Sequence, residues 1–414
     1  MEEFSSDELN PPSWMNDQFF KEVLRKCERT DKISIENIEI SPATAKGDHF
    51  ASIMFRAVVI FNSIQSKTQS KSMIIKIMPQ EEGCKQDFLK ESFAFETEIG
   101  MYSKTIPKLE EELRKVGDNT VLAAKALYWS LEPQKILILE DICLKGYKVL
   151  KDRMATMEES KIAFLKLAKW HAVSYKLSYE GDKNVTSYSE NIFSKKDADT
   201  TPFMLTGIEY LREKLETIDE FKKFIPDLKN VQKDNLKKSI ASAKSYRNES
   251  PKGIFVLNHG DFHVKNIMTK RNENGELEDV MLLDFQMSSY APAILDFMYG
   301  IYMLCNPSIC INNFDEVMYF YCSNFIDTLK QLKFEGEIPK ISDFYIELYR
   351  HRHFALFLIS SFMPLWYSIL EKHVENMDVL LASDEERKKM YGNSNYLRDL
   401  KPILQSMFYR GYLE

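Results

Sequence analysis

Cysteine is scarce in this 414-residue sequence, and no two cysteines stand in a metal-binding or disulfide spacing. The six are spread along the chain, and none forms a C-x-x-C pair. A structural zinc site or a disulfide framework is therefore not expected. Unpaired thiols are typical of a reducing compartment, so we expect a cytoplasmic protein.

The sequence also lacks an excess of basic residues and an apolar leader. The net charge is -7, with charges of both signs interspersed, which argues against a nucleic-acid partner. The first residues, MEEFSSDELNPPSW, are acidic and have no apolar core, so they do not form a secretory signal.

Long uncharged runs are almost absent. Residues 353–370 (HFALFLISSFMPLWYSIL) contain no Asp, Glu, Lys or Arg. A membrane-spanning helix needs about 20 apolar residues, and this segment also contains three serines and Pro364. A buried helix of a large domain is favoured over a membrane span, and we expect a monomer that does not cross a membrane.

Apolar patterning divides the chain into a sheet-rich and a helical part. Residues 36–79 predict strands, residues 85–103 a helix, and VLAAKALYWS and KILILED further strands. From about residue 155 helices dominate, interrupted by the strands NIMTK and VMLLDF around an Asn274-Gly275 hairpin turn. The first long helix is expected to bury the stripe Ile162, Leu165, Ala168, Ala172 and Tyr175.

These patterns predict an α+β, bilobal, protein-kinase-like fold with a small β-rich N-lobe and a large helical C-lobe. We expect a helical lead-in over residues 1–35, the N-lobe over 36–140 and the C-lobe over 141–414. No repeat or low-complexity segment is visible. The layout by itself establishes no function.

The segment VLNHGDFHVKNIM has the arrangement H-x-D-x-x-x-x-N, formed by His259, Asp261 and Asn266. Protein kinases carry this spacing in the catalytic loop. A hydroxyl that attacks a phosphoryl group needs an acceptor to orient it and take its proton, and Asp261 is the candidate base. Asn266 can offer a side-chain oxygen to Mg²⁺, which prefers hard oxygen ligands.

A second motif, LLDFQ, places Asp284 after an apolar strand downstream of Asn266. The metal-binding D-F-G of kinases falls at this point. Asp284 is therefore the candidate bridge between Mg²⁺ and the phosphates of ATP. The two motifs in this order around a hairpin predict a phosphotransferase site.

Lys76 lies among apolar strand residues in SMIIKIMP, where an ammonium group needs a partner. In kinases such a lysine contacts the phosphates and pairs with a glutamate on the following helix. Glu98 is the best candidate because it shares a helix face with apolar residues. Glu96 and Glu91 are the alternatives, as is an edge-strand charge with no nucleotide role.

Two further segments are candidates for nucleotide binding. KGDHFAS contains only Gly47, so it is not a G-x-G-x-x-G loop, but its backbone and the Ser52 hydroxyl can cover phosphates. The apolar strand LILED and the residues directly after it are predicted to form the segment that links the two lobes. Backbone groups around Glu140 and Ile142 would contact adenine there.

Four other residues lie in or near these motifs without a catalytic role assigned to them. His263 follows the candidate base and either contacts phosphate or substrate or is structural, and Lys265 is a further possible charge contact. His171 is expected to be a core histidine. Asp296, in AILDFMYG, is expected to accept backbone hydrogen bonds from the catalytic loop.

With these residues in place, the sequence resembles the insect ecdysteroid kinase-like family, also described as CHK-kinase-like and related to choline kinases and aminoglycoside phosphotransferases. HGDFHVKNIM, DVMLLDFQ, SPATAKGDHFASIMFR, FETEIGMY and LAKWHAVS carry the resemblance, which runs from about residue 10 nearly to the C-terminus.

The resemblance implies ATP- and Mg²⁺-dependent phosphorylation of an alcohol, with ecdysteroids or dietary and xenobiotic compounds as acceptors and detoxification as one role. Asp261 would be the base, Asn266 and Asp284 would hold the metal, and Lys76 with Glu98 would position the phosphates. Many relatives have Leu-Trp after the catalytic Asp, where this chain has Phe262-His263.

Two other functions are weighed against this one. One alternative is a catalytically inactive kinase-fold protein that binds a hormone or lipid. Its only support is that KGDHFAS lacks the G-x-G-x-x-G pattern of a phosphate-covering loop. A protein kinase is disfavoured because no A-P-E follows the Asp284 motif.

Overall fold

The computed structural model describes residues 9–43, 52–63, 68–79, 93–150, 153–193, 202–248, 252–373, 380 and 383–414. Two compact units form within the chain. The first comprises Met1–Ile106 and Ala123–Lys148, and the second Pro107–Leu122 and Val149–Glu414. Sheet structure dominates the first and helices dominate the second, so the predicted α+β, kinase-like fold class is confirmed. The domain boundaries drawn from the sequence stay a prediction.

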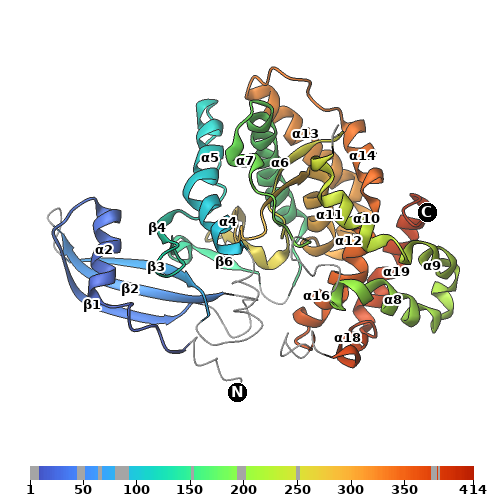
Figure 1. The fold of residues 1–414 in the computed structure, drawn as a ribbon, viewed down its shortest axis with the longest axis horizontal. Helices are drawn as coiled ribbons and strands as arrows, with labels where there is room; N and C mark the ends of the chain where they lie inside the picture. Colours follow the sequence, from blue (N-terminus) through green and yellow to red (C-terminus); the bar gives the residue numbers. More distant parts are fainter. Residues whose placement is uncertain are drawn as a thin grey trace. The chain divides into compact units, whose positions relative to one another are not determined.

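The first unit is built on an antiparallel sheet with strand order β1-β2-β3-β5-β4 (Figure 1). Its strands are β1 (Ile33–Pro42), β2 (Ile53–Ser63), β3 (Gln69–Ile77), β4 (Ala126–Ser130) and β5 (Ile136–Glu140). The strands predicted within residues 36–79 and in the two later segments are therefore present.

Helix α2 (Asp17–Glu28) covers one face of this sheet. The side chain of Asn16 caps its N-terminus by accepting from two backbone amides. Phe20 and Leu24 of the helix pack on Phe55 and Val59, which are alternate residues of β2. Ala57 shares this buried face, whereas Arg56 and Val58 face the opposite side of the sheet.

The helix predicted over 85–103 extends further than expected. Residues 85–92 lie outside the described part, and α4 (Ala94–Gly100) continues through the π-helical turn η1 (Met101–Thr105) into α5 (Ile106–Lys115). The 3-10 helix η2 (Ile142–Lys145) and the short strand β6 (Tyr147–Val149) follow the sheet.

The second unit is mainly helical. Its helices before the catalytic loop are α6 (Met157–Tyr179), α7 (Lys183–Thr186), α8 (Pro202–Glu216), η3 (Asp219–Phe224), α9 (Ile225–Gln232), α10 (Asn235–Ala243) and η4 (Ser245–Arg247). Those after it are α11 (Ala293–Met303), α12 (Pro307–Asn312), α13 (Phe314–Gln331), α14 (Ile341–Arg350), α15 (Arg352–Phe357), η6 (Leu358–Phe362), α16 (Met363–Leu370), α18 (Asp384–Met390) and α19 (Ser394–Tyr409).

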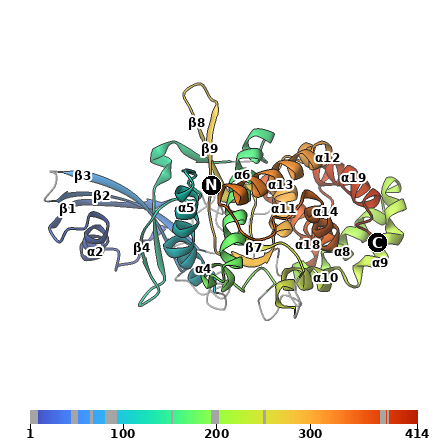
Figure 2. The same ribbon diagram turned by 90° about the horizontal axis from the view of Figure 1, so that it is seen from above.

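Two small antiparallel strand pairs lie in the segment between these two groups of helices. The hairpin of β8 (Ile267–Arg271) and β9 (Leu277–Leu282) was predicted, and it turns at Gly275, whose φ is +81° (Figure 2). The pair of β7 (Phe255–Asn258) and β10 (Ser289–Pro292) was not predicted, because each strand has only four residues.

The stripe expected on the long helix α6 is wrong in part. Ile162, Leu165 and Tyr175 are only half-buried, whereas Phe164 and Trp170 are fully buried. The helix is enclosed on most of its circumference, with α13 and β7 among its neighbours. A helix buried on several sides has no single apolar stripe to read from the sequence.

The uncharged segment near residue 360 forms one continuous helical run. Within the described residues, Arg352–Leu370 is the only helix long and apolar enough to cross a membrane, and 83% of its most apolar window is buried inside the protein. The run contains α15, the π-helical turn η6 and α16. Its apolarity is thus largely used in packing.

Candidate functional site

In the first unit, Lys76 and Glu98 form a buried ion pair. Lys76 lies on β3, between β2 and β5, and its Nζ is 2.7 Å from Oε2 of Glu98 on α4. Both side chains are at most 5% exposed. Of the two alternative partners, Glu96 instead pairs with Lys135 at 2.7 Å, and Glu91 lies outside the described residues.

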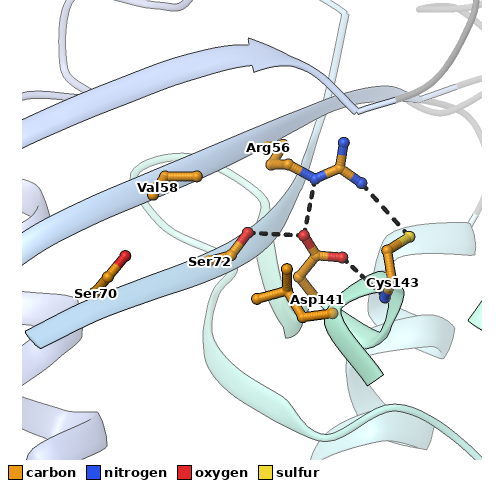
Figure 3. Close-up of a pocket in the computed structure, with 7 residues that line it drawn as sticks. Arg56, Val58, Ser70, Ser72, Asp141 and Cys143 are labelled. Atoms are coloured by element: carbon orange, nitrogen blue, oxygen red, sulfur yellow. Dashed lines mark hydrogen bonds and ion pairs between the residues drawn. The ribbon is translucent and has the colours of Figure 1, made fainter. Parts of the chain in front are cut away.

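A hollow of about 420 Å³ lies on the face of the sheet that carries Lys76 (Figure 3). Asp141, directly after β5, accepts a hydrogen bond from Nε of Arg56 at 2.8 Å and one from Ser72 at 2.7 Å. Burial by itself would raise the pKa of Asp141, but these donors lower it. The exposed Cys143 thiol also lines the hollow.

This hollow adjoins the segment predicted to contact adenine. Glu140 ends β5, and buried Ile142 begins η2, which Asp141 caps by accepting from the Cys143 amide at 3.1 Å. Ser52 is described and lies just before β2, whereas Gly47 lies outside the described residues. Sequence reasoning missed Arg56, because its partner stands 85 residues away.

In the second unit, the candidate catalytic loop follows β7 and turns at Gly260. The φ of Gly260 is +80°, a conformation that residues with a Cβ rarely adopt. A Cβ at this position would also overlap the carbonyl oxygen of Met287. Both the positive φ and the lack of space for a Cβ therefore require glycine at position 260. The close contact between Gly260 and Met287 holds the loop against the turn that follows Asp284.

Asp261 is held by three side chains. Its Oδ1 accepts from the Tyr299 hydroxyl at 2.8 Å. Its Oδ2 is 3.0 Å from Nδ2 of Asn266 and 3.2 Å from Nε2 of His263. Burial alone would raise the pKa of Asp261, but the contacts with His263 and Tyr299 outweigh it and bring the pKa to about 2. Asp261 is thus an ionised, oriented hydrogen-bond acceptor.

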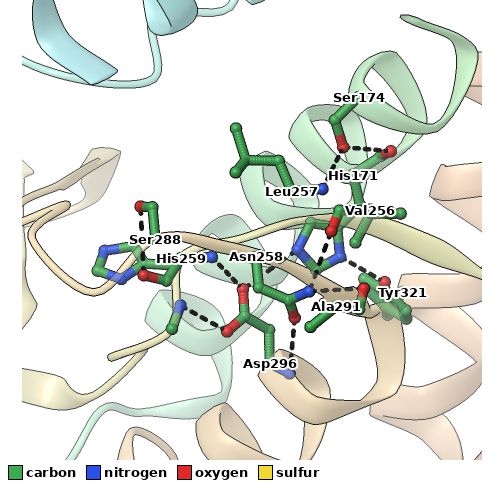
Figure 4. A network of polar contacts seen from close by, with 11 residues as sticks. His171, Ser174, Val256, Leu257, Asn258, His259, Ser288, Ala291, Asp296 and Tyr321 are labelled. Atoms are coloured by element: carbon green, nitrogen blue, oxygen red, sulfur yellow. Dashed lines mark hydrogen bonds and ion pairs between the residues drawn. The ribbon is translucent and has the colours of Figure 1, made fainter. Parts of the chain in front are cut away.

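Asp296 anchors the candidate catalytic loop through its carboxylate (Figure 4). Its carboxylate accepts from the backbone N–H of His259 at 2.5 Å and of Gly260 at 2.9 Å. His171, whose Nε2 is 3.2 Å away, adds a third contact and is itself 2.7 Å from the Tyr321 hydroxyl. The expected backbone role of Asp296 and the core role of His171 are both confirmed.

Two hydrogen bonds tie the Asp284 turn to the candidate catalytic loop. The Leu283 amide donates to the carbonyl of Asn266 at 2.9 Å, and Nε2 of His259 lies 2.9 Å from the Leu283 carbonyl. Burial lowers the pKa of His259, which keeps it a neutral donor. Asp284 and Asn266 are thereby held at adjoining ends of two paired strands.

The backbone of Asp284 is strained, with φ at +59°. Residues other than glycine occupy this region uncommonly, and such strain gathers at functional sites. Asp284 and Asn266 offer two hard oxygen donors, which suits Mg²⁺ because this ion usually takes few protein ligands and keeps water and phosphate. Within the described residues there is no group of three His, Cys, Asp or Glu side chains arranged for a metal.

Three aromatic residues near Asp261 were not found from the sequence. The ring of Trp366 on α16 lies 4.4 Å from that of His263, and Tyr299 on α11 lies 6.0 Å from Phe362. The indole nitrogen of Trp366 is buried and has no hydrogen-bond partner among the described residues. Spacing in the sequence gives no hint of these contacts, because they join segments up to 103 residues apart.

Comparison with solved structures gives distant resemblances. The chain is similar to the aminoglycoside 2'-phosphotransferase-IIIa GDP complex, with 12% identity, a TM-score of 0.43 and coverage of 92% of this chain and 99% of that one. It is also similar to the amicoumacin kinase hAmiN in complex with AMP-PNP, Ca²⁺ and Ami, with 13% identity, a TM-score of 0.38 and coverage of 92% and 94%.

Comparison with curated protein sequences gives no significant match. A family model, in contrast, matches residues 46–334, well over half of the chain. The match includes Lys76, the catalytic loop and the Asp284 turn. The chain therefore belongs to the ecdysteroid kinase-like family.

Proposed function

We propose that this protein is an ATP-dependent small-molecule kinase that transfers the γ-phosphoryl group to a hydroxyl of a non-protein acceptor. Family membership supports a small-molecule kinase. The observation that carries the proposal is the anchoring of ionised Asp261 by Tyr299, Asn266 and His263 on a loop bonded to the Asp284 turn. Phosphoryl transfer needs mainly positioning and electrostatic stabilisation, which such an arrangement provides.

Asp261 would orient the acceptor hydroxyl and take its proton. A carboxylate offers about four lone-pair directions, and three are used by the donors described above. A carboxyl group with a pKa of about 2 is a weak base in the ground state. Its proton transfer would therefore occur late, as the phosphoryl group reaches the oxygen and acidifies the hydroxyl.

Asn266 and Asp284 would hold Mg²⁺, which when bound neutralises phosphate charge. Lys76, kept in place by Glu98, would contact the phosphates. Backbone groups of the segment around Glu140 and Ile142 would contact adenine. Gly47 and Ser52 would cover the phosphates.

The acceptor is proposed to be an ecdysteroid or a dietary or xenobiotic alcohol or phenol. Support comes from the aromatic side chains next to the candidate base: Tyr299, which contacts it, Phe362, which packs on Tyr299, and Trp366, which packs on His263. Aromatic walls with few polar groups are common where proteins bind apolar small molecules. The unpartnered N–H of Trp366 is a donor suited to an oxygen of such a compound.

The test is Mg²⁺-dependent ATP binding and consumption by the purified protein with a panel of ecdysteroids and plant-derived alcohols and phenols. Asp261→Asn should bind ATP with little change and lower turnover by on the order of 100-fold or more. Asp284→Ala should instead weaken Mg²⁺-dependent ATP binding. Absence of any ATP binding would refute the proposal and favour a kinase-fold protein that binds a ligand without turnover.

A further inference from the structure

His263 lies directly against Asp261 and makes a contact with each of its ring nitrogens. Its Nδ1 accepts a hydrogen bond from the backbone N–H of Lys265 at 3.2 Å, which caps the short helix η5 (Val264–Asn266). Its Nε2 is 3.2 Å from Oδ2 of Asp261 and 3.3 Å from Nδ2 of Asn266. The side chain is only 10% exposed.

These contacts fix the tautomer of the ring. A backbone N–H can only donate, so Nδ1 must present a lone pair to Lys265 and carries no hydrogen. In the neutral ring the hydrogen is then on Nε2, which faces the carboxylate of Asp261. The hydrogen bond from the Lys265 backbone thus holds the ring so that its Nε2–H points at Asp261.

We propose that His263 is a positioning residue that orients Asp261 through its Nε2–H, and that it does not bind phosphate. This inference rests on the kinase function proposed above. His263 and Asn266 together occupy Oδ2 of Asp261, while Tyr299 occupies one of the two lone-pair directions of Oδ1. The acceptor hydroxyl therefore approaches Oδ1, beside the phenol of Tyr299.

Helix α16, which continues the π-helical turn η6, supplies the support for the ring. Trp366 stands one helical turn after Phe362, so both side chains share a face of the helix. Trp366 packs on His263 at 4.4 Å between ring centroids, and Phe362 packs on Tyr299 at 6.0 Å. Such turns recur at functional sites, and here one helical run braces His263 and Tyr299, two of the three side chains that touch Asp261.

Two substitutions separate the roles of the ring nitrogens. Glutamine can place an amide N–H where Nε2 lies, whereas asparagine reaches only the position of Nδ1. His263→Gln is expected to keep kcat within about 3-fold of the wild type, and His263→Asn to lower it about 10-fold or more, with KM for ATP unchanged in both. Thermal unfolding of both variants serves as the check on folding.

Equal losses of kcat in the two variants would overturn the inference, as would a rise in KM for ATP at constant kcat, which is the result expected of a phosphate contact. Failure of the wild type to turn over any acceptor would count against the proposed function instead.

A measurement that needs no turnover distinguishes failure of the His263 inference from failure of the proposed kinase function. Nitrogen NMR of protein labelled with ¹⁵N at its seven histidines, with His263→Gln used for assignment, reports the tautomer directly. A pyridine-like Nδ1 and a pyrrole-like Nε2 are expected for the neutral ring of His263. A hydrogen on Nδ1 would refute the inference whatever the activity.

Discussion

Asp296→Asn should destabilise the second unit and slow catalysis, because it changes one atom at the buried anchor of the catalytic loop. The carboxylate of Asp296 is almost inaccessible, at 1% exposure, and receives the backbone N–H groups of His259 and Gly260 on its two oxygens. An asparagine keeps the shape but has one oxygen, so one of these amides would face an NH₂ group.

The expected loss of folding stability follows from these two hydrogen bonds. A buried donor left without an acceptor costs about 1–3 kcal/mol, and loss of the charge from the other bond costs about 1 kcal/mol more. A total near 3 kcal/mol should lower the melting temperature by roughly 6 °C. Because Gly260 directly precedes Asp261, kcat should also fall by about 10-fold or more.

The assay is thermal and urea unfolding followed by steady-state kinetics. Asp327→Asn on α13 is the matched control, since it removes the same charge from a side chain that is 63% exposed and forms a surface ion pair with nearby Lys330. The control should change stability by less than about 0.5 kcal/mol. A melting temperature and kcat for Asp296→Asn equal to those of the control would refute the anchoring role.

Three further outcomes are expected. Burial raises the pKa of Glu159, but two arginines and an N-cap amide bring it down to about 2 from an ordinary 4.5. Its stabilisation is therefore complete above about pH 4.5 and lost as pH falls toward 2, so urea unfolding of Glu159→Gln should show a flatter acid dependence than the wild type. Lys76→Met should cost roughly 3 kcal/mol because it removes the cation that faces buried Glu98, and a Lys76→Met/Glu98→Leu double variant should recover much of that loss without recovering ATP affinity. Gly260→Ala should abolish turnover, because its Cβ would displace the turn at Met287; retained activity would contradict the required close approach.

Local patterns were sufficient for several features of the fold and the site. The Asn274-Gly275 turn fixed the hairpin between the two motifs, and the apolar helix around Asp296 indicated a buried acceptor for backbone amides. Both inferences depend on neighbours a few residues apart. The sequence also ranked Glu98 first among three possible partners of Lys76, and the structure pairs these two side chains.

Prediction from the sequence failed where an element is buried on several sides or is too short to show a periodic pattern of apolar residues. Helix α6 is enclosed by several elements, so its burial is not a stripe and the stripe expected at Ile162 and Leu165 failed. Strands β7 and β10 are too short to show alternation. The chemical roles assigned to the site residues stay predictions until they are measured.

The sequence by itself determined which residue types stand at Asp261, Asn266 and Asp284, because their spacing is a property of one loop and one hairpin. Only the tertiary structure decided what surrounds Asp261. Tyr299 and Trp366 come from helices 38 and 105 residues further along, and they meet the loop because α11 and α16 pack beside it. Packing also decided what each ring nitrogen of His263 faces, since Nδ1 receives the Lys265 amide and Nε2 lies against the Asp261 carboxylate.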